Sequence, residues 1–143
     1  MPFDPVSDYP LGSRRADLVT TPAGVPMSDV TLEALRAGRL DPQDIRATPE
    51  TIERQAAVAL AAGRRPLAEN LARAAELTSV PDETILEIYT ALRPHRSTAE
   101  ELEAWARRLE GELAAPKVAA LLREALDVYG RRGLLAAGER APG

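Results

Sequence analysis

The sequence contains no cysteine among its 143 residues. This absence excludes disulfide bridges, thiolate metal sites and cysteine nucleophiles, and it fits a reducing cytoplasm. Histidine is almost as scarce, because His95 is the only one. Neither a histidine pair nor a cysteine pair can be formed, so the sequence offers no metal motif with recognisable ligand spacing.

Aromatic residues make up only 3% of the chain, although 45% of its residues are hydrophobic. Alanine and leucine carry most of the apolar content, whereas pleated sheets prefer β-branched and aromatic residues. Thin helices that pack through small side chains are therefore favoured. The length suits one domain with a modest core.

Long apolar runs are missing too, since none approaches the ~20 residues needed to cross a bilayer. Pro2, Asp4 and Pro5 stand where a signal peptide carries a basic and then an apolar region. The formal net charge is -4, so no basic field attracts a phosphate backbone. We expect a soluble, cytoplasmic protein that binds neither membranes nor nucleic acid.

Proline is concentrated at the start of the chain, where residues 1–27 hold five of the twelve prolines and show no apolar periodicity. A proline-rich segment of that length cannot build a core of its own. We expect residues 1–27 to form an extended arm that lies along a partner, with a mobile tail as the alternative.

Helix start and stop signals recur from residue 28 onward. Asp41 is expected to cap a short helix beginning at Pro42, and Leu40 and Ile45 are spaced as a hydrophobic staple across it. Further helices are expected to begin at Pro49 with Thr48 as cap, at Pro66, after Pro81, after Ser97 and at Pro116. No segment alternates apolar and polar residues, so the predicted fold is all-α, with about five to six helices in one domain over residues 28–134. Residues 135–143 are expected to be a frayed tail.

Two of these helices show the apolar spacing most clearly. One carries apolar residues at i, i+3, i+4 and i+7, namely Ile85, Ile88, Tyr89 and Leu92. The other follows a predicted capping box of Ser97 and Glu100. Its face holds Leu102, Trp105, Ala106, Leu109 and Leu113. Tyr89 and Trp105 are the residues that could anchor a partner by type, but the spacing favours the chain's own core for both.

Few residues could carry chemistry. His95 lies between Pro94 and Arg96 in a connection between helices, without a sequence-evident acid or base partner. We expect it to be solvated or hydrogen-bonded, and neither catalytic nor metal-binding. Gly63 is expected to stop one helix, and Gly130 with Gly133 the last one. These glycines and Gly111 form no loop that would hold a phosphate after a strand.

Acidic residues gather in two groups near predicted helix starts, Asp82, Glu83 and Glu87, and Glu100, Glu101 and Glu103. The helix dipole favours negative charge there by about 0.3 to 1 kcal/mol each. A paired-carboxylate active site or a hard-cation site is the alternative interpretation. For both groups we prefer the explanation that the carboxylates stabilise helix starts.

Arginines come in four pairs, at residues 14 and 15, 64 and 65, 107 and 108, and 131 and 132. Such pairs can hold carboxylates across an interface, although a solvated helix face explains any one pair equally well. Residues 48–77 could also form a DNA-binding helix-turn-helix. The second helix carries Glu69 and Glu76 beside only Arg73, which is a poor surface for a phosphate-lined groove.

Longer stretches carry a resemblance. They begin with Asp8-Tyr9-Pro10-Leu11, Thr31-Leu32-Glu33, Asp44-Ile45-Arg46, Thr48-Pro49-Glu50-Thr51 and Ala62-Gly63-Arg64. The central ones are Arg73-Ala74-Ala75-Glu76-Leu77-Thr78, Val80-Pro81-Asp82, Ile85-Leu86-Glu87-Ile88-Tyr89, Ala91-Leu92-Arg93-Pro94, Arg96-Ser97-Thr98 and Glu100-Glu101-Leu102. From about Asp8 to Leu134, the chain resembles the small subunit of the coenzyme-B12-dependent diol and glycerol dehydratases.

This resemblance implies an assembly of large, medium and small subunits, two copies of each. In that family the large subunit is a barrel that binds the substrate and a cation, and adenosylcobalamin lies between the large and medium subunits. The assembly converts a vicinal diol to an aldehyde and water by a radical mechanism. The small subunit supplies no catalytic, cofactor-binding or metal-binding residue, so the resemblance implies none in this chain.

Some small subunits of the family carry an N-terminal extension linked to microcompartments, whereas only seven residues precede Asp8 here. The resemblance therefore leans toward the glycerol enzymes and leaves encapsulation open. A different class of function also stays open, a free-standing helical adaptor or regulator that binds a protein partner. The sequence indicates neither the preferred diol nor the interface residues.

Overall fold

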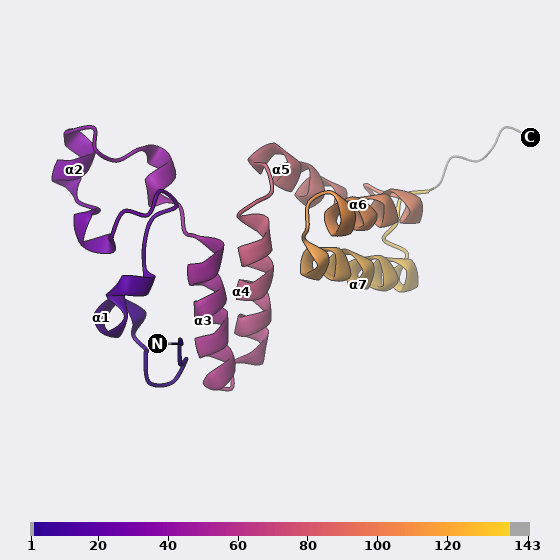
Figure 1. The fold of residues 1–143 in the computed structure, drawn as a ribbon. Coiled ribbons are helices and arrows are strands. Elements are labelled where there is room, and N and C mark those ends of the chain that lie inside the picture. The colour runs from indigo at the N-terminus through magenta and orange to yellow at the C-terminus, as the bar shows by residue number, and fades with distance from the viewer. Residues whose placement is uncertain (1, 138–143) are drawn as a thin grey trace, which may run out of the picture. The chain divides into compact units, whose positions relative to one another are not determined.

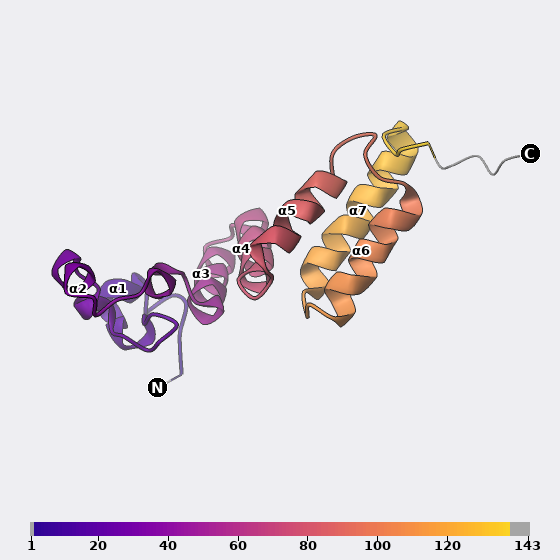
Figure 2. The ribbon, with the colours of Figure 1, turned by 90° about the horizontal axis from the view of Figure 1, so that it is seen from above.

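The computed structural model describes residues 2–137, and Figures 1 and 2 show an all-α fold, as the sequence predicts. The described residues form seven α-helices and three short 3-10 helices, with only one isolated bridge, between Thr20 and Pro26. Contacts divide the chain into two units, Met1–Thr78 and Ser79–Gly143. We call them unit 1 and unit 2 and describe each by itself.

Unit 1 is built on a hairpin of α3 (Pro49–Ala61) and α4 (Arg65–Leu77), which lie side by side in both views. The predicted cap is present, because the Thr48 hydroxyl accepts a hydrogen bond from the Thr51 amide at 3.3 Å. Gly63 has a φ of 74°, the left-handed conformation that the sequence predicts for the turn. Local chemistry therefore sets both ends of the hairpin.

Before the hairpin, unit 1 contains five short elements. They are α1 (Leu11–Arg14), η1 (Ala16–Leu18), η2 (Met27–Asp29), α2 (Leu32–Arg36) and η3 (Pro42–Ile45). The sequence predicts an extended arm over residues 1–27, whereas the structure folds parts of it into α1 and η1. Arg54 of α3 donates to the carbonyl of Leu18 at 2.8 Å, which ties the arm to the hairpin.

The short element η3 confirms one prediction and corrects another. Its N-terminus is a capping box: the Asp41 carboxylate accepts from the Gln43 amide at 3.0 Å, and Asp44 accepts from the Asp41 amide at 2.8 Å. Leu40 is buried, but Ile45 remains 68% exposed. The predicted staple between these two side chains is therefore wrong, because Ile45 faces solvent.

Unit 2 contains α5 (Asp82–Ala91), α6 (Ala99–Gly111) and α7 (Pro116–Arg132). Helices α6 and α7 lie side by side (Figure 2). The three large side chains with the least exposure in the described chain all come from this pair, Leu102, Leu109 and Leu122. Buried alanines fill the space around them, at Ala106, Ala115 and Ala119.

The cap of α6 lies one residue later than the sequence predicts. Thr98 accepts from the Glu101 amide at 3.2 Å, and the Glu101 carboxylate accepts from the Thr98 amide at 2.8 Å. The predicted box of Ser97 and Glu100 is wrong because the Ser97 side chain is buried. Its hydroxyl donates to the carbonyl of Ala91 at 2.9 Å.

The end of unit 2 folds back on the α5–α6 connection. Gly133 ends α7 with a φ of 65°, whereas Gly130 lies inside the helix. The His95 amide donates to the carbonyl of Leu134, and the Ala136 amide donates to the carbonyl of Ser97 at 2.8 Å. The predicted tail, 135–143, is thus hydrogen-bonded at its start, and residues 138–143 lie outside the described residues.

Candidate functional site

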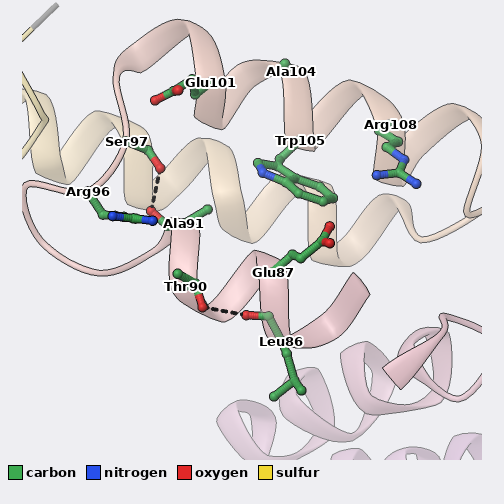
Figure 3. A pocket seen from close by; sticks show the side chains of 10 residues that line it. All are labelled: Leu86, Glu87, Thr90, Ala91, Arg96, Ser97, Glu101, Ala104, Trp105 and Arg108. Carbon is green, nitrogen blue, oxygen red and sulfur yellow. Dashed lines mark hydrogen bonds between the residues drawn. The ribbon is translucent and has the colours of Figure 1, made fainter. Parts of the chain in front are cut away.

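An open groove of about 650 Å³ lies between α5 and α6 in unit 2 (Figure 3). We call it the α5–α6 groove. Its lining residues are Leu86, Glu87, Thr90, Ala91, Arg96, Ser97, Glu101, Ala104, Trp105 and Arg108. This volume lies within the range typical of ligand pockets, although the groove is open to solvent.

The walls of this groove combine small and large apolar groups. Leu86 is 65% exposed, and the indole of Trp105 is half-buried. Ala91 and Ala104 have only methyl groups, which leaves the space between the helices open. The Arg108 guanidinium lies 5.2 Å from the centre of the Trp105 ring, within the range of a cation–π contact.

Most polar groups of the groove already have partners. The hydroxyls of Ser97 and Thr90 donate to backbone carbonyls at 2.9 and 2.8 Å, as Figure 3 shows. Glu101 is occupied as the helix cap, and Arg108 pairs with Glu112 at 3.2 Å, outside the groove. The groove therefore presents apolar surface with few polar atoms left to bind a ligand.

Two charged side chains of the groove are exceptions. The side chains of Glu87 in α5 and Arg96 in the connecting loop make no hydrogen bond or ion pair with any other described residue. Both residues are exposed, so water solvates these charges in the free chain. They are the charges available to an incoming partner.

A second groove, of about 460 Å³, lies within unit 1 between the arm and the α3–α4 hairpin. We call it the arm groove. Its lining residues are Pro5, Val6, Tyr9, Gln55, Val58, Ala59, Ala61, Ala62, Arg64, Leu67 and Leu71. Val6, Tyr9 and Leu67 are 73%, 58% and 44% exposed. An exposed apolar patch of this kind marks an interaction surface more often than a reaction centre.

Most of the acidic residues in the two predicted groups lie in the first turn of a helix. Asp82 and Glu83 occupy the first turn of α5, and Glu100 and Glu101 occupy the first turn of α6. Glu103 instead meets Arg123 of α7 at 3.3 Å, and Arg123 also reaches Glu110 at 2.9 Å. The hydrogen bond from Arg123 lowers the pKa of Glu110 below its ordinary value. These contacts join α6 to α7.

Four of the eight paired arginines, Arg14, Arg15, Arg108 and Arg131, contact other residues of the chain through their side chains. Arg15 forms ion pairs with Asp8 at 2.9 Å and with Asp17 at 3.1 Å, and the hydrogen bond it donates lowers the pKa of Asp17. Arg131 pairs with Asp127 at 2.8 Å along α7. The Arg15–Asp8 pair is half-buried and the Arg131–Asp127 pair is exposed, and both link residues of the same chain, as an arginine fork suits.

His95 lies in the exposed loop after α5, with a positive φ of 60°. Its side chain does not line the α5–α6 groove. Over residues 2–137, no three side chains of histidine, cysteine, aspartate or glutamate gather closely enough to hold a metal ion. In the same residues, no helix combines the length and the apolar character that crossing a membrane requires.

Tyr89 and Trp105 depart from the prediction that both side chains lie in the core of the chain. Tyr89 is 61% exposed, and Trp105 lies at the groove with part of its ring accessible. The i+4 spacing from Ile85 placed Tyr89 on the apolar face, but only Ile88 and Ala91 of α5 are buried. Leu86 and Tyr89, three residues apart, form an exposed apolar stripe on α5, which the apolar spacing in the sequence did not indicate.

Comparisons with known proteins agree with one another. The model of the dehydratase small subunit family matches residues 5–136. The propanediol dehydratase small subunit of Salmonella typhimurium is 50% identical over 127 residues, which cover 89% of this chain and 73% of that protein. The propanediol dehydratase small subunit of Citrobacter freundii is 49% identical over 127 residues, covering 89% of this chain and 74% of its own length.

Proposed function

The chain belongs to the dehydratase small-subunit family, and from this premise we propose that it is the small subunit of a coenzyme-B12-dependent propanediol dehydratase. The observation that carries the proposal is identity of about half the residues along almost the whole chain. Both relatives named above are propanediol proteins, so propane-1,2-diol is the substrate proposed for the assembly. We propose propane-1,2-diol in preference to glycerol for this reason.

In this proposal the chain works by holding larger subunits in their active arrangement, and it contributes no catalytic, cofactor-binding or metal-binding residue. Its partners are the large and medium dehydratase subunits, two copies of each of the three chains. The assembly lies in the cytoplasm, which the lack of cysteine supports.

The donor groups of this chain do not fit adenosylcobalamin or a cation. The only imidazole, on His95, lies in an exposed loop and lines neither groove. Carboxylates that could serve as ligands are already engaged, since Glu101 caps α6 and Glu103 pairs with Arg123. Both groups are therefore assigned to the partner subunits, and no step of the reaction is derived from residues of this chain.

The arm groove supports a docking role. Val6, Tyr9 and Leu67 expose apolar surface that a small helical protein gains by covering, at about 25 cal/mol for each Å² removed from water. The ion pairs of Arg15 with Asp8 and Asp17 hold the arm's shape before any partner arrives. A preformed surface loses less conformational entropy when it binds.

Co-expression of the tagged chain with the large and medium subunits tests this proposal. We expect all three chains to be recovered in equal amounts, and we expect turnover of propane-1,2-diol with adenosylcobalamin only in the complete assembly. Leu67→Asp, which places a charge in the arm groove, should reduce recovery of the partners. Its control is Glu69→Ala, an exposed site on the same helix outside the groove.

Two results would contradict the proposal. Turnover of the diol by the isolated chain would show that it carries catalytic groups. Recovery of the chain alone, without either partner, would favour a free-standing adaptor.

A further inference from the structure

We propose that the α5–α6 groove receives one amphipathic helix of a partner dehydratase subunit, an inference that rests on the proposed function. The apolar face of that helix packs on Leu86 and Trp105. Its polar edges carry an acidic side chain that pairs with Arg96 and a basic side chain that pairs with Glu87.

Packing gives the first reason. Leu86 of α5 is 65% exposed at the edge of the groove, with its side chain directed away from α6 in Figure 3, and Trp105 of α6 has Arg108 5.2 Å from the centre of its ring. Ala91 and Ala104 add only methyl groups to the lining, which leaves a channel between the two helices. The row of side chains on a third helix fits such a channel as a ridge fits into a groove.

The backbone gives the second reason, because it selects a helix over an extended peptide. The peptide groups of α5 and α6 are engaged within their own helices, and the hydroxyls of Thr90 and Ser97 donate to carbonyls of the same chain. An extended segment would therefore bury peptide groups without partners, which is costly. A helix satisfies its own peptide groups before it binds.

Charge gives the third reason. The side chains of Glu87 and Arg96 have no partner among residues 2–137, whereas Glu101 caps α6 and Arg108 pairs with Glu112. The groove thus presents one anion and one cation beside apolar surface. A helix with charges of opposite sign at its edges complements this arrangement, and a uniformly acidic or basic helix does not.

Cysteine scanning tests the proposal, since the chain has no cysteine of its own. Ala104→Cys places a thiol in the groove, and Ala120→Cys places one on the exposed side of α7, outside the groove lining. We expect maleimide to label Ala104→Cys at least about tenfold more slowly in the assembled dehydratase than in the free chain, because a covered interface excludes solvent. Labelling of Ala120→Cys should change by less than about twofold.

Unchanged labelling of Ala104→Cys in a complete assembly would overturn the groove proposal and leave the proposed function standing. Equal protection of both thiols would also count against the groove as the particular docking place. Failure of the three chains to assemble at all would instead contradict the proposed function. Labelling and assembly therefore distinguish a failure of the groove proposal from a failure of the proposed function.

Charge reversal supplies an independent measurement. Arg96→Glu should weaken association with the partner subunits by about tenfold, because it places two carboxylates opposite each other. The matched control is Arg107→Glu, an exposed arginine of α6 that does not line the groove, with an expected change below about twofold. Equal effects of the two reversals would show that Arg96 has no specific partner.

Discussion

Units 1 and 2 are each built on a pair of packed helices, but they bury different side chains. The α3–α4 pair buries alanines, Ala59, Ala68 and Ala75, whereas the α6–α7 pair buries the leucines Leu102, Leu109 and Leu122. Full burial of a leucine side chain contributes about 1.5 to 3 kcal/mol, and a single methyl group far less. The α6–α7 pair therefore has the stronger core of the two.

Exposed apolar surface follows the opposite trend. Among the described residues, eleven large hydrophobic side chains are exposed, and eight belong to unit 1, namely Val6, Tyr9, Met27, Leu32, Leu35, Ile45, Leu60 and Leu67. Unit 2 exposes only three, namely Leu86, Tyr89 and Leu121. Unit 1 thus keeps outside much of what could have been its core, which is the composition expected of a part that is completed by partner subunits.

The sharpest test of this difference removes a core leucine. Leu109→Ala should lower the free energy of unfolding of unit 2 by about 2 to 5 kcal/mol. Leu71→Ala, at a half-buried site of α4, should cost unit 1 less, about 1 to 2 kcal/mol. Urea unfolding of the full chain measures both: fluorescence of Trp105, the only tryptophan, follows unit 2, and far-ultraviolet circular dichroism follows the whole chain. Equal losses would remove the distinction between the two cores.

A smaller effect is expected from adding volume to the alanine seam. Ala75 is 3% exposed on α4 in unit 1. Ala75→Leu should destabilise unit 1 by about 1 to 3 kcal/mol, because a tightly packed seam has no room for three more carbons. Glu69→Leu on the exposed side of α4 is the control and should stay within about 0.5 kcal/mol. Stabilisation by Ala75→Leu, measured by circular dichroism, would show that the seam is loosely packed.

Lowering the pH should have the smallest effect on the free energy of unfolding, and it should lower the stability of both units. Arg15 lowers the pKa of Asp17 in unit 1, and Arg123 lowers the pKa of Glu110 in unit 2. A carboxyl whose pKa is lower in the folded state stabilises the fold above its unfolded pKa. That contribution is lost as the pH falls through the lower, folded value, below about pH 4. Both groups are exposed, so solvent screening keeps the contribution small.

Thermal unfolding from pH 7 to pH 3 measures this acid effect. Glu110→Gln should flatten the acid limb slightly relative to the unchanged chain. Glu124→Gln, at an exposed carboxyl of α7 that contacts no arginine within residues 2–137, should leave the limb as it is. A steeper acid limb in Glu110→Gln would mean that the Arg123 contact does not stabilise unit 2.

Sequence patterns predicted the helix boundaries well because the atoms responsible lie close together along the chain. Thr48 and Gly63 act within one turn of the helix ends that they define. The prediction was off by one residue at the start of α6, where Ser97 and Thr98 are equally good caps by type. The carbonyl of Ala91, which reaches Ser97 from α5, decided between them.

Neither groove could be predicted in this way. Tyr89 has the spacing of a core residue, and only the packing of α5 against its neighbours placed Ile88 inside and Tyr89 outside. Arg96 and Trp105 come from different segments, and no local pattern shows that they line one groove. Grooves depend on how helices pack, and that information is spread over residues far apart in the chain.

The sequence by itself determined the all-α fold, the start of each long helix from α3 to α7 to within a residue or two and, through nearly continuous resemblance, the family. The fold and the helix starts follow from local caps and apolar periodicity. The family follows from stretches that resemble it in the same order along the chain. Only the tertiary structure decided which side chains are buried, which arginines find carboxylates and where surface is left for a partner. Burial and ion pairing are set by neighbours in space, and alanine or leucine at a helical spacing can face either a core or a partner.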